Sequence, residues 1–286
     1  MTSYRLAVLS LAVAATAFAA PPLKVDVFAA GSDGFFVTST LVSGERDAVL
    51  IDGQFTLSEA HRLTAVLLES KKNLKTIFIT HAHPDHFFGL EVIKAQFPNA
   101  EVLTTPAVAA EMKVITPAKL LTWKPIYGTN LTNAPVTPKT FAGGYLDLEG
   151  QRLDLISLPA GESESATVVW VPSIRTAVVG DLAFNRVHVW LAETNPIRRE
   201  NWLRNLAKVK ALDPRVVVSG HEAPGAERTP SVLDDTAAYL RDFNAAILTS
   251  KTADELEKKM LATHADWQLP VILSISSKAA LPGPKS

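Results

Sequence analysis

The sequence predicts a layered α/β fold, with sheets inside and helices outside, on three observations. Short apolar segments with strand patterns alternate with helical segments in both halves of the chain. Polar residues follow several of these apolar segments, which is where α/β proteins commonly place ligands. The composition, 47% hydrophobic and 20% charged over 286 residues, provides a sizeable core and argues against disorder.

Charge and cysteine content exclude several classes of function. The 28 basic and 29 acidic residues give a net charge of −1, and the sequence has no basic stripe of the kind that binds nucleic acid. The chain has no cysteine, so disulfides and thiolate metal ligands are ruled out. A metal site in this chain must therefore use imidazole and carboxylate groups.

The first residues have the layout of a secretory signal peptide. Arg5 supplies a positive charge, residues 6–20 form an apolar run, and Ala17-Phe18-Ala19 is a small-x-small cleavage signal. The run is shorter than the roughly 20 residues that a membrane helix needs. We expect cleavage after Ala19, a secreted or periplasmic protein without membrane association, and one domain over residues 20–286 that ends in helices.

Apolar runs predict strands, and helical periodicity predicts the segments between them. The expected strands are residues 24–28, 35–41, 47–52, 74–80, 101–103, 145–148, 152–158, 167–171, 176–179 and 215–219. The expected helices are residues 57–70, 87–95, 106–114, 196–212, 231–247 and 253–263.

Residues 116–144 differ from the rest because they are rich in Pro, Thr, Asn and Gly. We expect a long loop here, either part of the functional site or a plain surface excursion. Trp123 and Tyr127 in this loop, and Glu164 later in the chain, are candidate substrate contacts, although each is more commonly an ordinary loop residue.

Polar groups follow the predicted strands at five points. They are Asp52, the segment from His81 to His86, Gly161-Glu162, Gly180-Asp181 and Gly220-His221. Since polar groups at strand ends of α/β proteins commonly meet at one site, we expect these groups to do so.

The segment His81-Ala-His83-Pro-Asp85-His86 carries the clearest chemistry. Residues two apart in an extended segment point the same way, so His81 and His83 can bind one ion. Pro84 is suited to the start of a helix, which turns Asp85 and His86 toward a second ion. Imidazoles with a carboxylate suit zinc, iron or manganese.

This ordered set resembles the metallo-β-lactamase superfamily, through His81-x-His83-x-Asp85-His86 followed by Asp181 and His221. The resemblance implies a four-layer αβ/βα sandwich with two divalent metal ions, zinc first and iron or manganese as alternatives. It implies that His81 and His83 bind one ion, that Asp85, His86 and His221 bind the other, and that Asp181 bridges them. Asp52 is expected beside the site, where it orients the ligands.

The sequence departs from the family at Glu162, where the family usually has a histidine on the first metal. Either the carboxylate replaces the imidazole, or Glu162 points away and the first metal is weak or absent. We favour ligation, because burying an unpaired carboxylate beside two imidazoles would be costly.

The expected reaction is hydrolysis of a small-molecule substrate. Two cations about 3.5–4 Å apart share a water and lower its pKa, and the resulting hydroxide attacks the substrate, with Asp85 as the catalytic proton carrier. An aspartate at position 181 resembles the lactonase, glyoxalase-II-like and phosphodiesterase branches of the family. A secreted hydrolase of an ester, lactone or amide is therefore expected, with lactones first.

Three alternatives stay open at this point. They are a β-lactamase, an iron-dependent redox enzyme of the same fold, and a non-catalytic metal- or ligand-binding relative. His188 could contact the substrate, but a core or surface position fits its sequence context equally well. His61 and His264 are expected to be solvated.

Overall fold

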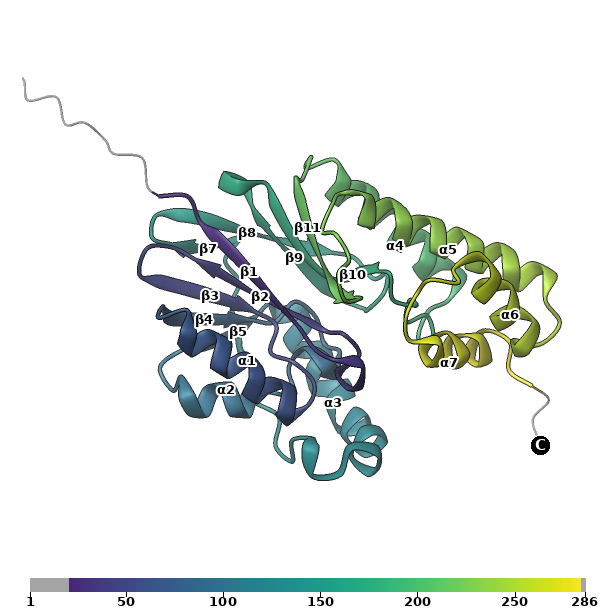
Figure 1. Cartoon of the computed structure of the whole chain (residues 1–286), viewed down its shortest axis with the longest axis horizontal. Coiled ribbons are helices and arrows are strands. Elements are labelled where there is room, and N and C mark those ends of the chain that lie inside the picture. The colour runs from purple at the N-terminus through teal and green to yellow at the C-terminus, as the bar shows by residue number, and fades with distance from the viewer. Residues whose placement is uncertain (1–20, 284–286) are drawn as a thin grey trace, which may run out of the picture.

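The computed structural model describes residues 21–283. The predicted signal peptide, residues 1–19, lies outside these residues. In the described part, seven helices surround two sheets (Figure 1). No helix between residues 21 and 283 is both long and apolar enough to cross a membrane.

The two sheets are both mixed. The first contains, in spatial order, β1 (Lys24–Ala29), β2 (Thr38–Ser43), β3 (Asp47–Ile51), β4 (Asn73–Phe78), β5 (Glu101–Thr104) and β6 (Lys139–Thr140). The second contains β11 (Val216–Glu222), β10 (Thr176–Asn185), β9 (Ala166–Val171), β8 (Gln151–Leu158) and β7 (Tyr145–Leu148). The strands β3 to β6 pair in parallel, as do β10 and β11, and the other pairs are antiparallel.

The helices cover the outer faces of the sheets and give the sandwich its four layers (Figure 1). The helices of the first half are α1 (Leu57–Glu69), α2 (Leu90–Gln96) and α3 (Pro106–Tyr127), and those of the second half are α4 (Pro196–Lys210), α5 (Ser231–Thr249), α6 (Ala253–Thr263) and α7 (Pro270–Ala280). An apolar cluster between the sheets includes Val49 and Phe78 from the first sheet and Val169 and Val178 from the second. The predicted α/β sandwich is therefore confirmed.

The end of β3 shows how the fold delivers a polar side chain to the site. Ala48 to Ile51 are completely buried, as expected for a strand in the middle of a sheet. Asp52 then adopts a left-handed conformation with φ of 63°, which is uncommon outside glycine and marks a functional position in many proteins. Its carboxylate accepts hydrogen bonds from the backbone and side chain of Thr80, just after β4.

The prediction of a loop throughout residues 116–144 is wrong. Helix α3 continues to Tyr127 and contains Pro117 and Pro125 in its interior. Both prolines lie on the exposed side of the helix, where water can satisfy the carbonyls that lose their helical partners. The Pro- and Thr-rich composition therefore reflects a solvent-facing helix that lies on the surface of the molecule.

Several other boundaries also differ from the prediction. Strands β10 and β11 continue to Asn185 and Glu222, so Asp181 and His221 lie within strands instead of following them. Helix α2 starts only at Leu90, after a short 3-10 turn over Pro84–His86. Helix α7 was not predicted. His264, which was expected to be solvated, is buried against Tyr239 and Trp267.

Candidate metal centre

The His81–His86 segment follows β4 and lies where the two sheets meet. His81 forms an isolated β-bridge with Ala166, and the Thr167 backbone N–H donates to the Thr80 carbonyl at 2.9 Å. These contacts bring the loop that carries Glu162 next to the histidines. The ring centroid of His81 lies 4.9 Å from that of His83 and 4.3 Å from that of His86.

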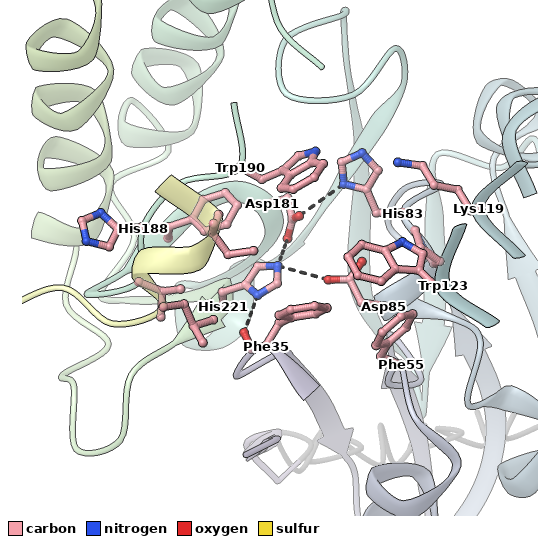
Figure 2. A pocket seen from close by; sticks show the side chains of 15 residues that line it. Phe35, Phe55, His83, Asp85, Lys119, Trp123, Asp181, His188, Trp190 and His221 are labelled. Atoms are coloured by element: carbon pink, nitrogen blue, oxygen red, sulfur yellow. Dashed lines mark hydrogen bonds and ion pairs between the residues drawn. The ribbon is translucent and has the colours of Figure 1, made fainter. Parts of the chain in front are cut away.

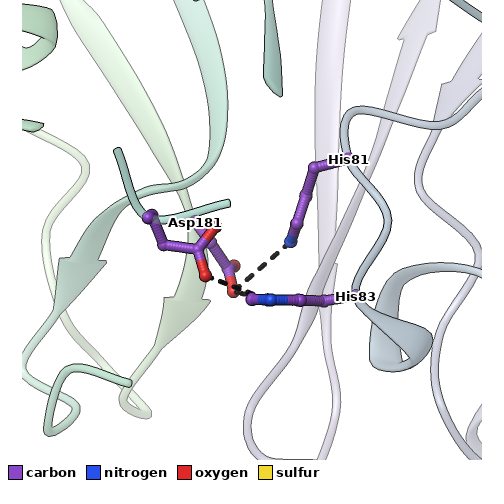
Figure 3. Close-up of side chains that lie close together, drawn as sticks. His81, His83 and Asp181 are labelled. Atoms are coloured by element: carbon purple, nitrogen blue, oxygen red, sulfur yellow. Dashed lines mark hydrogen bonds and ion pairs between the residues drawn. The ribbon is translucent and has the colours of Figure 1, made fainter. Parts of the chain in front are cut away.

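One group of potential ligands combines His81, His83, Glu162 and Asp181. All four are buried, and one ligand atom from each lies within 4.8 Å of the others. His83 Nδ1 lies 3.0 Å from Glu162 Oε1 and 3.4 Å from Asp181 Oδ2, and His81 Nε2 lies 3.4 Å from the same Asp181 oxygen. Figure 3 shows His81 and His83 converging on Asp181. Glu162 therefore points into the cluster.

A second group combines Asp85, His86 and His221. The other oxygen of Asp181, Oδ1, lies 3.0 Å from His86 Nε2 and 3.3 Å from His221 Nε2. Asp85 Oδ2 lies 3.4 Å from His221 Nε2 and 3.9 Å from His86 Nε2. Asp181 therefore contacts both groups. Its Oδ2 lies near His81 and His83, and its Oδ1 lies near His86 and His221.

Acceptors outside the cluster hold the histidines in fixed orientations. Asp52 Oδ2 lies 2.9 Å from His86 Nδ1, and the Phe35 carbonyl lies 2.7 Å from His221 Nδ1. The Thr80 hydroxyl donates to Asp52, so it accepts from His81 Nδ1 at 2.9 Å. The Nε2 atoms of these three histidines then face the carboxylates of the cluster with free lone pairs.

Glu162 is held through its own backbone. Arg198 of α4 donates from Nη2 to the Glu162 carbonyl at 2.8 Å and from Nε to the Gly161 carbonyl at 3.0 Å. On the other side of the loop, the Glu111 carboxylate accepts from the backbone N–H groups of Glu164 and Ser165. These hydrogen bonds hold the loop between α3 and α4 and so fix the backbone position of Glu162.

Two glycines permit the close approach of the two halves of the site. A Cβ on Gly220 would lie 2.0 Å from Asp181 Oδ1, far inside any allowed contact. Gly180 has a positive φ of 52°, and a Cβ there would lie 2.8 Å from the Thr80 hydroxyl. The two dipeptides Gly180-Asp181 and Gly220-His221 therefore need glycine for steric reasons.

The electrostatics of the cluster favour a cation between the ligands. Burial lowers the pKa of His83, but the charge of Glu162 and a hydrogen bond with Asp181 outweigh it and raise this pKa well above its usual value. The pKa values of His86 and His221 are raised against burial in the same way, mainly by the charge of Asp181. Burial raises the pKa of Asp181, but the charges of His221, His86 and His81 more than offset this and hold it well below the usual range.

The residues fit a divalent metal pair. Within the described residues, no hydrogen bond reaches His81 Nε2, His86 Nε2, Asp181 Oδ1 or either carboxylate oxygen of Glu162. Buried lone pairs that face one another are repulsive unless a proton or a metal cation lies between them. Imidazole nitrogens and carboxylate oxygens at this spacing are donors that zinc, iron and manganese accept.

A pocket of about 500 Å³, including its open mouth, adjoins the cluster (Figure 2). Four of the potential ligands, His83, Asp85, Asp181 and His221, line this pocket. Its walls are mainly apolar and aromatic, formed by Phe35, Phe55, Trp123, Phe184, Val187, Trp190, Leu269 and Ile272. The second half of α3 and the start of α7 thus form part of the pocket, although neither helical segment was predicted.

His188 also lines the pocket, but its side chain is completely buried. Its Nδ1 lies 2.9 Å from the Tyr239 hydroxyl. Burial, with a smaller contribution from His264, lowers the pKa of His188 to about 4, and burial raises the pKa of Tyr239. The imidazole is therefore neutral at neutral pH, and its contact with substrate stays a prediction.

Two charged residues near the cluster were missed in the sequence. Glu193 Oε2 lies 3.3 Å from His83 Nε2, and Glu193 Oε1 forms an ion pair with Lys119 at 2.6 Å. The hydrogen bond with His83 holds the pKa of Glu193 far below its usual value, and Lys119 contributes further. Neither residue follows a strand or belongs to a motif, so only the tertiary structure brings them to the site. Of the other candidate contacts, Trp123 lines the pocket, whereas Glu164 is exposed and paired with Arg198.

The sequence matches the model of the metallo-beta-lactamase superfamily over residues 32–221. The chain belongs to this superfamily. The matched region begins before β2 and ends at His221, so it includes every residue of the two ligand groups. This superfamily member therefore combines a metal-dependent hydrolase fold with a buried His, Asp and Glu cluster.

Solved structures share the fold at low sequence identity. A metallo-beta-lactamase family protein from Thermus thermophilus is 21% identical, with a TM-score of 0.64 and coverage of 91% of this chain and 92% of its own. A metallo-beta-lactamase from Pontibacter korlensis is also 21% identical, with a TM-score of 0.59 and coverage of 79% and 97%. A beta-lactamase domain protein from Burkholderia ambifaria is 13% identical, with a TM-score of 0.63 and coverage of 91% and 86%. No curated protein matches the sequence.

Proposed function

We propose that this protein is a secreted, dinuclear metal-dependent hydrolase that cleaves a small ester, lactone or amide. The observation that supports this function most directly is that residues of both ligand groups line one largely apolar pocket. His81, His83 and Glu162 would hold one divalent ion, Asp85, His86 and His221 the other, and Asp181 would bridge them. Secretion rests on the sequence of residues 1–19 alone.

Two divalent cations, when bound, would lower the pKa of a shared water and polarise the substrate oxygen. The protein contributes the orientation of the ligands. The acceptors around His81, His86 and His221 keep the Nε2 lone pairs directed inward, which avoids any reorganisation when the site is filled. The aromatic walls exclude bulk water from the reacting groups and so strengthen the local electrostatic interactions.

Asp85 is the proposed proton carrier. It lines the pocket, and its side chain is 14% exposed, compared with 2% for Asp181. A carboxylate in this position can take the proton of the attacking water and pass it to the leaving group. General acid–base catalysis of this kind contributes about 10²- to 10⁴-fold to a rate.

The experiment uses Asp85→Asn and a panel of p-nitrophenyl acetate, dihydrocoumarin and a chromogenic β-lactam. We expect kcat on the confirmed substrate to fall about 10²- to 10⁴-fold. The metal content of the variant is measured alongside, because Asp85 is also a proposed ligand, and Asp254→Asn on the exposed start of α6 is the control. Unchanged kcat in Asp85→Asn would contradict the mechanism, and no turnover of any substrate would contradict the hydrolase function.

The Glu162 carboxylate also favours a second candidate function. A carboxylate in place of an imidazole makes the donor set harder and more suited to iron, so an iron-dependent redox enzyme of the same fold is the alternative. Dominant iron and a visible absorption band in protein purified without added metal would favour the redox function. Dominant zinc would favour hydrolysis.

A further inference from the structure

The cationic side chain that lines the pocket is neutralised by a neighbouring carboxylate. Among the described residues that line the pocket, Lys119 is the only one with a cationic side chain apart from the histidines. Its Nζ lies 2.6 Å from Glu193 Oε1 and 5.8 Å from the centre of the Trp190 ring. The ammonium group is therefore already paired before any ligand enters.

Two further contacts hold Glu193 beside Lys119. Its second carboxylate oxygen lies 3.3 Å from His83 Nε2, and its backbone carbonyl accepts from Arg198 Nη1 at 3.2 Å. The Lys119 side chain is 16% exposed and that of Glu193 is 42% exposed. The pair therefore joins Lys119 of α3, which lines the pocket (Figure 2), to Glu193 in the loop that precedes α4.

The ligand cluster is also balanced in charge. Asp52, Asp85, Glu162 and Asp181 together offer four carboxylates, whose negative charge equals the positive charge of two divalent ions before any bound hydroxide is counted. An imidazole at position 162 would leave such a centre with an excess positive charge, whereas the carboxylate removes it. Neither the filled cluster nor the Lys119–Glu193 pair then offers net positive charge to an incoming anion.

We propose that this pocket selects uncharged, apolar substrates, and that Glu193 enforces the selection by neutralising Lys119. The proposal rests on the proposed hydrolase function for the identity of the reaction. A substrate carboxylate would have to leave water for aromatic walls without a free cation to meet it, which costs free energy. A neutral ester or lactone carries no such cost and gains from contact with Phe35, Trp123 and Trp190. Glu193 thus acts as a specificity-determining residue through Lys119.

The test compares two esters of nearly the same shape, the neutral 4-carbamoylphenyl acetate and the anionic 4-carboxyphenyl acetate, with each kcat/KM divided by the rate constant of that ester's uncatalysed hydrolysis. For the wild-type protein we expect kcat/KM to be about 10- to 100-fold higher for the neutral ester. Glu193→Gln frees Lys119, so this ratio should fall by about 2- to 5-fold. Lys119→Met removes the cation and leaves the negative charge of Glu193, which among the described residues then pairs only with His83, so the ratio should rise by a similar factor. The double variant should return to the wild-type ratio.

The ratio of the two kcat/KM values separates the effect of substrate charge from other effects of these variants. Any loss of activity through the Glu193–His83 contact affects both esters equally and cancels. Glu200→Gln, which removes one partner of an exposed ion pair with Arg204 on α4, is the matched control and should leave the ratio unchanged. Equal or better turnover of the anionic ester by the wild-type protein would overturn the proposal, as would single variants that shift the ratio in the same direction or do not shift it.

A binding measurement separates this proposal from the hydrolase function. Phenylacetamide and phenylacetate are titrated into protein stripped of metal, with quenching of tryptophan fluorescence as the signal, since Trp123 and Trp190 line the pocket. We expect the preference for the neutral ligand, given by the ratio of the two Kd values, to fall in Glu193→Gln and to rise in Lys119→Met. If neither these esters nor the substrates of the panel above are hydrolysed, the hydrolase function fails, but opposite shifts in binding would still support the selection of uncharged ligands. Absence of opposite shifts in binding would overturn the selection, even if the esters are hydrolysed.

Discussion

The two sides of the ligand cluster are anchored by different kinds of group. The histidine side depends on Asp52 and Thr80, which are buried where the strands β3 and β4 end and hold His81 and His86 directly. The Glu162 side depends on Arg198 and Glu111, which hold the backbone of its loop, and Arg198 also pairs with the Glu164 carboxylate. Within the described part of the chain, none of their hydrogen bonds reaches the Glu162 side chain. The comparison indicates that the histidine side is fixed by the core of the fold, whereas the Glu162 side can change with less effect on folding.

The largest effect is expected from Asp52→Ala, which breaks the histidine side. The substitution removes the acceptor for the Thr80 N–H, the Thr80 hydroxyl and His86 Nδ1. Buried groups that lose their partner cost about 1–3 kcal/mol each, so we expect the free energy of unfolding to fall by about 3 kcal/mol or more. Chemical denaturation measures this loss, and Asp47→Ala on the half-buried start of β3 is the control. An unfolding curve like that of the wild type would contradict the direct anchoring of the histidine side.

The next largest effect is expected from Gly220→Ala, which tests how closely the two sides of the cluster pack. In Gly220→Ala, the added Cβ would lie 2.0 Å from Asp181 Oδ1, so Asp181 must move away from both ligand groups. We expect a loss of metal binding and a destabilisation of about 1–3 kcal/mol, typical of overpacking. Gly144→Ala, where a Cβ meets nothing within 4 Å, is the matched control. Normal metal content in Gly220→Ala would show that the bridging position of Asp181 is not required.

A smaller effect is expected from Arg198→Met, which breaks the Glu162 side. The variant loses the hydrogen bonds to the carbonyls of Gly161, Glu162 and Glu193 and the ion pair with Glu164. Metal affinity should fall about 10-fold, at the lower end of the 10- to 100-fold range for residues that support ligands, while the unfolding free energy changes by only about 1 kcal/mol. Competition with a chromophoric chelator measures the affinity, and Arg204→Met on the same helix serves as the control. A loss of stability as large as that in Asp52→Ala would remove the distinction between the two sides.

Removal of metal probes both sides together. The buried lone pairs of His81, His86, Asp181 and Glu162 lack hydrogen bonds from the described residues, so a bound cation should stabilise the folded state. We expect a chelator to lower the Tm of the wild-type protein and to have a smaller effect on Gly220→Ala. An unchanged Tm after verified removal of metal would show that the cluster is stable without a cation.

The sequence predicts the histidine side better than the pocket around it. Asp52 and the segment from His81 to His86 each follow an apolar strand, which is a local pattern that indicates a site. Asp181 and His221 each follow a glycine that the close packing requires. By contrast, Pro117 and Pro125 suggested a loop where α3 forms a wall of the pocket. Glu193 and Lys119 lie in different elements with no spacing rule between them, so only tertiary packing makes them a pair. His264 is buried because Tyr239 and Trp267 pack around it, which its local sequence does not reveal.

The most direct test of the account is the metal content per chain, measured by elemental mass spectrometry on protein purified without added metal. The comparison includes Glu162→Gln, which keeps the shape of the side chain but removes its charge, and Glu164→Gln as the exposed control in the same loop. If Glu162 is a ligand, we expect about two divalent ions per chain in the wild type and in Glu164→Gln, and a clear loss in Glu162→Gln. One ion or none in the wild type, or the same content in Glu162→Gln, would contradict the assignment of Glu162 as a ligand.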